Sequence, residues 1–174
     1  MRMHHYLAFL VLVAFANMRC SPSEEPLFVM QLEADFNILA GLNAFDTHFF
    51  IIRNVPTRIE SYLNNAVDEE LIDRILPNRA ELNARFVNVD WALVREVQIL
   101  AVDPTDPNNK KEIFYHDRVD LNNVNELRLL SSLSEVKDIL LQDWINLEVR
   151  LNFRRPTPVE IESRLTMNFV VNGK

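Results

Sequence analysis

Two stretches in the C-terminal part of the chain alternate between apolar and polar residues, and this pattern narrows the choice of fold most. In residues 145–153 every second side chain is apolar, and residues 161–169 repeat the pattern except that Ser163 takes one of the apolar positions. Successive side chains of a β-strand point to opposite faces, so each stretch predicts a strand with one buried and one solvated face. The polar faces carry acidic and basic residues, as cross-strand pairing requires. We therefore expect these two strands to pair with each other as neighbours.

Shorter stretches with the same period or with aromatic and β-branched residues predict further strands. They are residues 28–36, 48–55, 79–86, 94–102, 112–115 and 126–130. The strand at 94–102 is expected to pair with the one at 112–115, because residues 103–110 between them are rich in Asp, Asn and Pro, which favour turns. Capping residues and apolar spacing predict three short helices. They are residues 58–65, a segment from Asp68 to just before Pro77, and a segment from Ser132 to Leu140.

This series of strands with few helices predicts a mainly β fold. We expect residues 27–172 to form one immunoglobulin-like antiparallel β-sandwich with two or three short helices. The Cys, Trp, Cys spacing of antibody domains is missing, so the comparison concerns architecture alone. A small β-barrel would give the same alternation and is the alternative.

The N-terminal residues predict export. Arg2, His4 and His5 precede an apolar run at residues 7–16. This run matches the core of a signal peptide and is shorter than the roughly 20 apolar residues of a membrane-spanning helix. We interpret residues 1–19 as a signal peptide and residues 20–26 as a polar tether.

The junction after the apolar run allows two forms of processing. Ala14 and Ala16 flank Phe15 as in a signal-peptidase site, and cleavage there would release a soluble protein starting near Asn17. Alternatively, Cys20, the only cysteine, becomes the first residue and carries a lipid. Residues 17–26 resemble the start of a bacterial lipoprotein, with a cysteine just beyond the apolar core and then a polar, acidic, proline-containing segment. The resemblance implies a lipid anchor at Cys20 and a location at the outer membrane or in the periplasm.

Composition excludes several classes of function. Residues 1–19 contain Arg2 and Arg19 but no acid, so the remainder has 16 basic against 25 acidic residues and a net charge of −9. Such a chain repels phosphate backbones, and nucleic acid is not expected as a partner. Only Gly41 and Gly173 are glycines, too few for phosphate-binding loops or a nucleophile elbow. We therefore expect no cofactor.

Few side chains are candidates for chemistry. Beyond the signal peptide only His48 and His116 are histidines, so a structural zinc is not expected. His116 stands between Tyr115 and Asp117, but no nucleophile or oxyanion loop accompanies it, and we predict no catalytic residues. His48 is expected to be a partly buried packing residue.

Two other features concern binding. Residues 103–109 are rich in oxygen ligands, as calcium requires, yet they lack the glycine and glutamate of an EF-hand and are interpreted as a plain hairpin loop. The two tryptophans, Trp91 and Trp144, are the candidates for a binding surface, because an indole on a polar face is costly to leave in water.

The export signal, residues 33–36 and 47–56, the strand at 95–99 and the two closing strands are together similar to uncharacterised bacterial envelope lipoproteins with β-sandwich domains. The resemblance brings no catalytic residues with it. We expect a non-enzymatic envelope lipoprotein that is held at the membrane by its lipid and acts through a protein partner, as an accessory subunit. The alternative is a soluble periplasmic or secreted binding domain for a small ligand or glycan.

Overall fold

The computed structural model describes residues 25–63, 68–122 and 125–174. The predicted signal peptide and Cys20 lie outside this part of the chain. The strands are β1 (Phe28–Ile38), β2 (Thr47–Pro56), β3 (Ile72–Ala84), β4 (Val94–Val102), β5 (Lys110–His116), β6 (Leu127–Ser131), β7 (Trp144–Phe153) and β8 (Ile161–Gly173). Two short α-helices, α2 (Ile59–Leu63) and α3 (Lys137–Leu140), and two single turns of 3-10 helix complete the fold.

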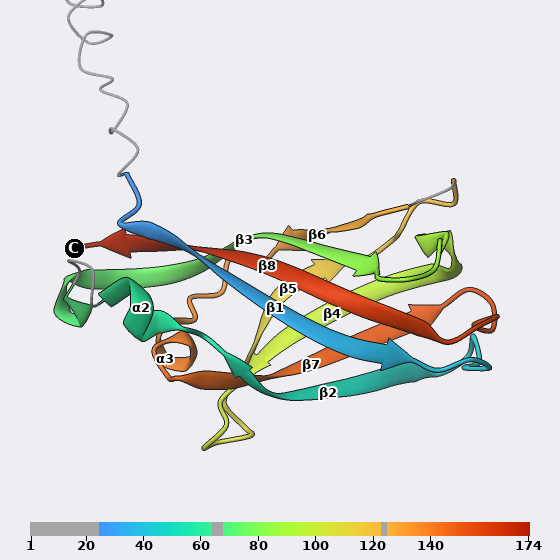
Figure 1. Ribbon diagram of the computed structural model, residues 1–174, viewed down its shortest axis with the longest axis horizontal. Coiled ribbons are helices and arrows are strands. Elements are labelled where there is room, and N and C mark those ends of the chain that lie inside the picture. Colours follow the sequence, from blue (N-terminus) through green and yellow to red (C-terminus); the bar gives the residue numbers. More distant parts are fainter. Residues whose placement is uncertain (1–24, 64–67, 123–124) are drawn as a thin grey trace, which may run out of the picture.

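All strand pairs are antiparallel, and the strand order is β1-β8-β3-β6-β5-β4-β7-β2. Only two residue pairs, Phe114 with Ser131 and Tyr115 with Leu130, join β5 to β6. This short link divides the strands into two layers, β1-β8-β3-β6 and β2-β7-β4-β5 (Figure 1). The predicted mainly β, antiparallel, sandwich-like architecture is therefore confirmed.

The connections differ from those of an immunoglobulin domain. There, the first two strands are neighbours in one layer, whereas here β1 and β2 lie in different layers. Every connection except β4 to β5 leads from one layer to the other. A double sheet of eight strands wound in this way is a jelly roll, so the immunoglobulin-like part of the prediction is not confirmed.

The sheet is also nearly closed, which is a feature of the alternative prediction, a small barrel. Its two end strands, β1 and β2, contact each other, and the rings of Phe36 and Phe50 lie 5.3 Å apart with their planes tilted by 50°. The molecule is thus a flattened barrel in which side chains, and not a ladder of hydrogen bonds, close the gap between β1 and β2. Side-chain closure also covers the unpaired backbone of two edges.

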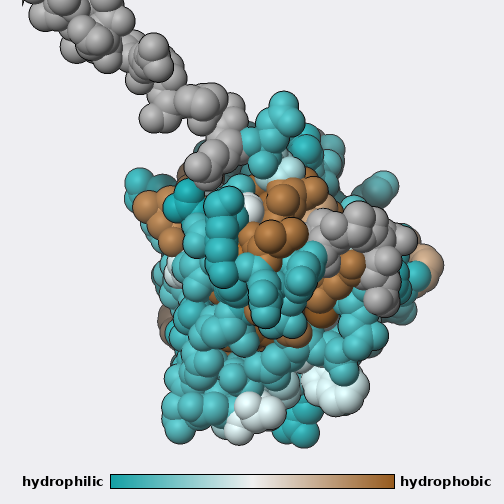
Figure 2. Space-filling model, turned by 90° about the vertical axis from the view of Figure 1, so that its left-hand side faces the viewer, coloured by the Kyte–Doolittle hydropathy of each residue, from teal (hydrophilic) through white to brown (hydrophobic). Residues whose placement is uncertain are grey.

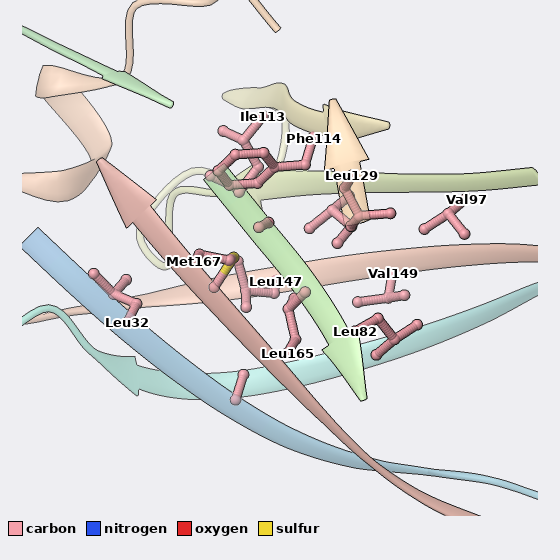
Figure 3. Packing of buried hydrophobic residues seen from close by; sticks show 14 of the residues in the cluster. Leu32, Leu82, Val97, Ile113, Phe114, Leu129, Leu147, Val149, Leu165 and Met167 are labelled. Carbon is pink, nitrogen blue, oxygen red and sulfur yellow. The ribbon is translucent and has the colours of Figure 1, made fainter. Parts of the chain in front are cut away.

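The core lies between the two layers. Leu82, Leu165 and Met167 from one layer meet Leu147 and Val149 from the other (Figure 3), and each of the five is fully buried. The largest buried side chains of the core are Trp91, Phe114, Phe153 and Phe169. The rings of Phe114 and Phe169 meet edge to face with centroids 5.6 Å apart, an arrangement that the ring quadrupoles favour.

The last two strands do not pair with each other, contrary to prediction. β7 lies between β2 and β4, and β8 lies between β1 and β3. Their alternating apolar residues face each other across the core, and this packing satisfies the same pattern as a hairpin would. The Pro-Thr-Pro segment at 156–158 carries the chain from one layer to the other.

The helix predicted from Asp68 is also wrong beyond its first turn. The Asp68 carboxylate accepts a hydrogen bond from the Glu70 backbone N–H at 3.2 Å, but the turn ends at Leu71 and Ile72 begins β3. Ile72 and Ile75 are both fully buried, although they are three residues apart, because the register with β8 shifts between Ile72 and Arg74. A β-bulge therefore produced the spacing that resembled a helix. The other two predicted helices are present as α2 and α3.

Candidate functional site

Four loops gather at one end of the sandwich. They are residues 39–46, 85–93, 117–122 and 154–160, on the right-hand side of Figure 1. Thr157, which is 3% exposed, ties the first loop to the fourth. Its backbone N–H donates to the Leu42 carbonyl (3.1 Å) and its hydroxyl donates to the Leu39 carbonyl (2.7 Å). The same hydroxyl accepts from the Leu42 N–H (2.9 Å), and the Thr157 carbonyl accepts from the Gly41 N–H (2.9 Å).

The first loop turns at Gly41, which has φ of 81°, a conformation that favours glycine.

Arg154 joins the remaining loops to this pair. Its backbone N–H donates to the Leu93 carbonyl (2.8 Å), and its guanidinium donates to the Ala92 carbonyl (2.9 Å). The guanidinium also donates to the carbonyls of Val94 and Val119, the latter in the loop between β5 and β6. Hydrogen bonds from a charged donor are stronger than neutral ones, so Arg154 holds three chain segments together. Arg154 and Thr157 thus make one framework of the four loops.

The tied loops expose apolar side chains. Phe45 is 95% exposed, Leu121 is 74% exposed and Phe86 is 70% exposed. Leu39, Val87 and Val159 in the same loops are each between 42% and 57% exposed. The guanidinium of Arg85 lies 4.8 Å from the centre of the Phe86 ring, a cation–π contact that orients the ring. Exposed aromatic side chains on an ordered framework are typical of contact surfaces. We call this surface, formed by Leu39, Phe45, Phe86, Val87, Leu121 and Val159, the loop-tip surface.

The opposite end of the sandwich holds α2, the start of β1 and the end of β8. Figure 2 looks onto this end and shows hydrophobic side chains between hydrophilic ones. Leu27 is 38% exposed and Leu71 is 51% exposed. A Cβ atom on Gly173 would lie 3.2 Å from the Leu27 side chain, so the glycine lets Leu27 close over the end of β8. The chain enters the domain at this end, far from the loop-tip surface.

A groove lies on the layer β2-β7-β4-β5, beside the loop at 103–109. It is open to solvent, encloses about 620 Å³, and lies beside Trp144, which is 52% exposed. Its walls are Ile51, Arg53, Asn54, Val102, Pro104, Pro107, Lys110, Trp144, Asn146 and Glu148. Ligand sites of this size are common, and half of the ten residues that line this one are polar or charged.

A β-bulge shapes one wall of the groove. The register between β2 and β7 shifts between Ile52 and Val55, and Asn54 adopts φ of 56° there. Its backbone N–H donates to the Asn146 side-chain oxygen at 3.1 Å. Non-glycine residues rarely adopt positive φ, and bulges commonly turn a side chain out of the regular alternation. Here Arg53 and Asn54 in succession both line the groove.

An ion network follows the outer face next to the groove. Glu148 accepts from Lys110 (3.3 Å) and from Arg150 (2.6 Å). Arg150 also donates to Gln98 (2.9 Å) and lies 5.5 Å from the centre of the Phe49 ring. Burial alone would raise the pKa of Glu148, but the hydrogen bonds from Arg150 and Lys110 outweigh it and lower that pKa. Two cations therefore share one carboxylate.

The outer face of the layer β1-β8-β3-β6 carries charged side chains that pair with one another. Arg164 donates to both carboxylate oxygens of Asp35 at 2.8 Å and lies 3.5 Å from Glu33. The hydrogen bonds from Arg164 lower the pKa of Asp35 and raise that of Arg164. The polar residues of this layer pair among themselves, which is typical of a solvated surface.

The two tryptophans predicted to form a binding surface, Trp91 and Trp144, differ in exposure. Trp91 is fully buried, so its place on a binding surface is wrong. It begins a turn capped by Asp90, whose carboxylate accepts from the Ala92 N–H at 3.0 Å, and this turn carries the indole inward. Its ring N–H finds no acceptor in the described part of the chain. Trp144 is half exposed and lines the groove, where its role in contact stays a prediction.

The structure describes two of the histidines, His48 and His116. The His48 ring donates from Nε2 to the Asn43 carbonyl at 2.9 Å and packs 5.5 Å from the Phe153 ring, so its predicted packing role is confirmed. His116 is partly buried, and its Nδ1 has no hydrogen-bond partner among the described residues. Neither Tyr115 nor Asp117, its neighbours in the sequence, therefore bonds to Nδ1.

The loop at 103–109 is a hairpin connection, as predicted. The Asp103 carboxylate accepts from the Thr105 N–H (2.8 Å), the Thr105 hydroxyl (2.7 Å) and the Asn109 side chain (3.3 Å). Donors thus occupy the oxygens that calcium would need. Among residues 25–63, 68–122 and 125–174, no three His, Cys, Asp or Glu side chains gather as a metal site. In the same part of the chain, no helix has the length and apolar character to span a membrane.

Comparisons with known proteins support no functional assignment. No protein-family model and no curated protein matches the chain. Among solved structures, the chain is similar to the cyanophage Pam1 capsid asymmetric unit, with a TM-score of 0.40 and 6% identity over 89% of this chain and 94% of that one. It is similar to the decameric BFDV capsid protein with a TM-score of 0.35 and 8% identity, over 83% and 97% of the two chains. For Cocksfoot mottle virus the TM-score is 0.28 and the identity 12%, over 84% of both chains. At these TM-scores the similarities carry no conclusion about function.

Proposed function

We propose that this chain is a non-enzymatic envelope lipoprotein that binds a protein partner through the loop-tip surface, as an accessory subunit of a membrane assembly. The observation that carries the proposal is that Thr157 and Arg154 tie four loops into one unit whose tips expose Phe45 and Phe86 to water. Exposed aromatic rings are costly to leave in water and are frequent anchors at protein interfaces.

The hydrogen bonds among the loops favour tight binding. A mobile loop loses conformational entropy when it is ordered at an interface, and this loss weakens association. In this protein the four hydrogen bonds at Thr157 and those of Arg154 already order the loops in the free domain. A partner that binds this surface therefore has to order the loops less, and the loss of conformational entropy on binding is smaller.

The geometry fits a lipid at Cys20. The chain enters the domain at the end opposite the loops (Figure 1). A tether of residues 20–26 spans at most about 25 Å when extended. A lipid on Cys20 would thus hold the α2 end toward the bilayer and direct the loop-tip surface away from it, toward a partner.

The anchor is tested by replacing Cys20 with serine. We expect the wild type in the membrane fraction and the Cys20→Ser variant in the soluble periplasmic fraction, with globomycin blocking maturation of the wild type. A wild type that is wholly soluble would contradict the lipoprotein assignment and would favour cleavage after Ala16.

The contact surface is tested with a double variant, Phe45→Ser with Phe86→Ser. Both residues are at least 70% exposed, so the domain should fold normally. After cross-linking in native membranes and mass spectrometry, we expect a partner that co-purifies with the wild type and is lost with the double variant. Leu133→Ser is the matched control, because Leu133 is 98% exposed but lies between β6 and β7 at the other end. Equal loss in both variants, or retention in both, would refute the loop-tip surface as the contact site.

The alternative, a binding domain for a small ligand or glycan, is supported by the groove beside Trp144. Aromatic walls with neighbouring amide and charged groups suit such ligands. A lipid anchor is not required for this function.

A further inference from the structure

In the groove beside Trp144, the exposed indole ring lies next to polar side chains. The Trp144 ring is half exposed, although indole is among the most apolar side chains. The C–H faces of a sugar ring are apolar, whereas its rim carries hydroxyl groups, so a sugar stacks on an aromatic ring while its rim bonds to polar neighbours. Asn54 and Asn146 stand at the rim of this groove. The Asn146 oxygen is occupied by the Asn54 N–H, which directs the amide –NH₂ of Asn146 toward other acceptors.

The groove carries positive charge in an acidic protein. Arg53 lines it and makes no hydrogen bond or ion pair with any residue in the described ranges. Lys110 also lines it, and its partner Glu148 is shared with Arg150. Glu148 is the only carboxylate among the lining residues, against Arg53 and Lys110, and Arg150 adds a third cation next to it. The whole chain, by contrast, has a net charge of −7.

The bulge fixes the backbone next to Arg53. The positive φ of Asn54 is stabilised by the hydrogen bond to Asn146, so the β2 backbone at this point is fixed to β7. A guanidinium presents paired N–H donors that match the two oxygens of a carboxylate. With no protein partner taking these donors, Arg53 is available to an incoming anion.

We propose that this groove binds a saccharide that bears a carboxylate, with Trp144 under the sugar ring and Arg53 on the acid group. The proposal rests on the alternative function given above, and it names the ligand class of that function. Lys110, Asn54 and Asn146 bond to the remaining oxygens. The sugar can belong to a free oligosaccharide or to a polysaccharide of an envelope or matrix, because the recognised chemistry is the same.

The experiment compares trigalacturonic acid with its fully methyl-esterified form, which has the same sugar rings and linkages but no charge. Trp144 is the only exposed tryptophan of the two in the chain, because Trp91 is fully buried. Iodide quenching of tryptophan emission therefore reports on the groove, and isothermal titration calorimetry supplies the affinity. We expect the acid to protect Trp144 from iodide and to bind about tenfold more tightly than the ester, with the difference shrinking as salt is raised. Polygalacturonic acid should bind at the same site.

Variants separate the contribution of the Arg53 charge from that of stacking on Trp144. Arg53→Gln should weaken binding of the acid about tenfold and leave binding of the ester unchanged. Trp144→Ala should abolish binding of both, and Trp144→Tyr should restore part of it. Arg155→Gln is the matched control, because Arg155 is exposed in the loop between β7 and β8, away from the groove. Circular dichroism checks that each variant is folded.

Each other outcome would overturn the inference. Equal affinity for acid and ester would refute the role of charge while leaving a neutral glycan site, and thus the alternative function, in place. Absence of binding by either probe at millimolar concentration would refute both the inference and the alternative function. The partner assay at the loop-tip surface is independent of all these results.

Discussion

Replacing Asp103 with asparagine tests whether the hairpin loop between β4 and β5 is held by a charged group. Asp103 is 9% exposed, and one of its carboxylate oxygens accepts from the Thr105 hydroxyl (2.7 Å), the Thr105 N–H (2.8 Å) and the Asp106 N–H (3.3 Å). The hydrogen bond from the Thr105 hydroxyl is the largest cause that lowers its pKa, from 3.8 to about 2, against the opposing effect of burial.

The magnitude follows from this pKa. A lowering from 3.8 to about 2 corresponds to at most about 2.4 kcal/mol of folding free energy at neutral pH. Water at the rim of the loop screens the interaction, so we expect Asp103→Asn to reduce the free energy of unfolding by about 1 to 2 kcal/mol at pH 7. Because the folded state has the lower pKa, the carboxylate stabilises the protein above pH 3.8. This contribution is lost as the pH falls toward 2.

The assay is urea unfolding followed by circular dichroism, for wild type and variant, at pH 7, 4 and 3. The difference between the two proteins should be largest at pH 7 and should shrink steadily below pH 4. Thr105→Val removes the hydroxyl donor but keeps the carboxylate, and should show a smaller difference in the same pH range. In the double variant the two effects should not add, since both act on one interaction. A difference for Asp103→Asn that is independent of pH would refute this reasoning.

Three further substitutions test the framework and the core. Arg154→Met removes a charged donor to three carbonyls and should lower the free energy of unfolding by about 2 to 3 kcal/mol, with faster amide exchange in the loops at 85–93 and 117–122. Thr157→Val keeps the shape but removes both hydroxyl hydrogen bonds, and thermal unfolding should show a loss of about 1 to 3 kcal/mol. Phe169→Ala leaves a cavity opposite Phe114, and denaturant unfolding should show a loss of about 3 to 5 kcal/mol, whereas a loss below 1 kcal/mol would contradict the assigned core.

The sequence contained enough information to predict the strands and the pairing of β4 with β5, but not the neighbours of β7 and β8. Alternation at 145–153 and 161–169 identifies which side chains are buried, and these are buried in the structure. The same alternation satisfies both a hairpin and two facing layers, so the pattern could not distinguish β7 beside β8 from β7 opposite β8. The two prolines around Thr157 were the available signal for a connection that leaves the layer.

Local patterns misled where tertiary contacts decided the outcome. Ile72 and Ile75 have the spacing of a helix, and only the pairing with β8 reveals the bulge between Ile72 and Arg74. Trp91 directly follows the charged Asp90, yet the Asp90 cap turns it inward. The ties at Thr157 and Arg154 join residues far apart in the chain, Leu42 to Thr157 and Val119 to Arg154, and no local signal announces them.

The position of β8 governs when this protein can fold. β8 lies between β1 and β3 and pairs Val171 with Phe28 on one side and with Ile75 on the other, so one of the two layers has no centre until the last strand has been synthesised. Contacts between residues so far apart in the sequence form slowly, because the long loop between them must lose conformational entropy before the strands pair and stabilise it. A nascent chain therefore cannot complete this layer before β8 has been synthesised. For the export proposed above, such late closure would favour passage through a secretion channel, because a channel of this kind admits an unfolded polypeptide.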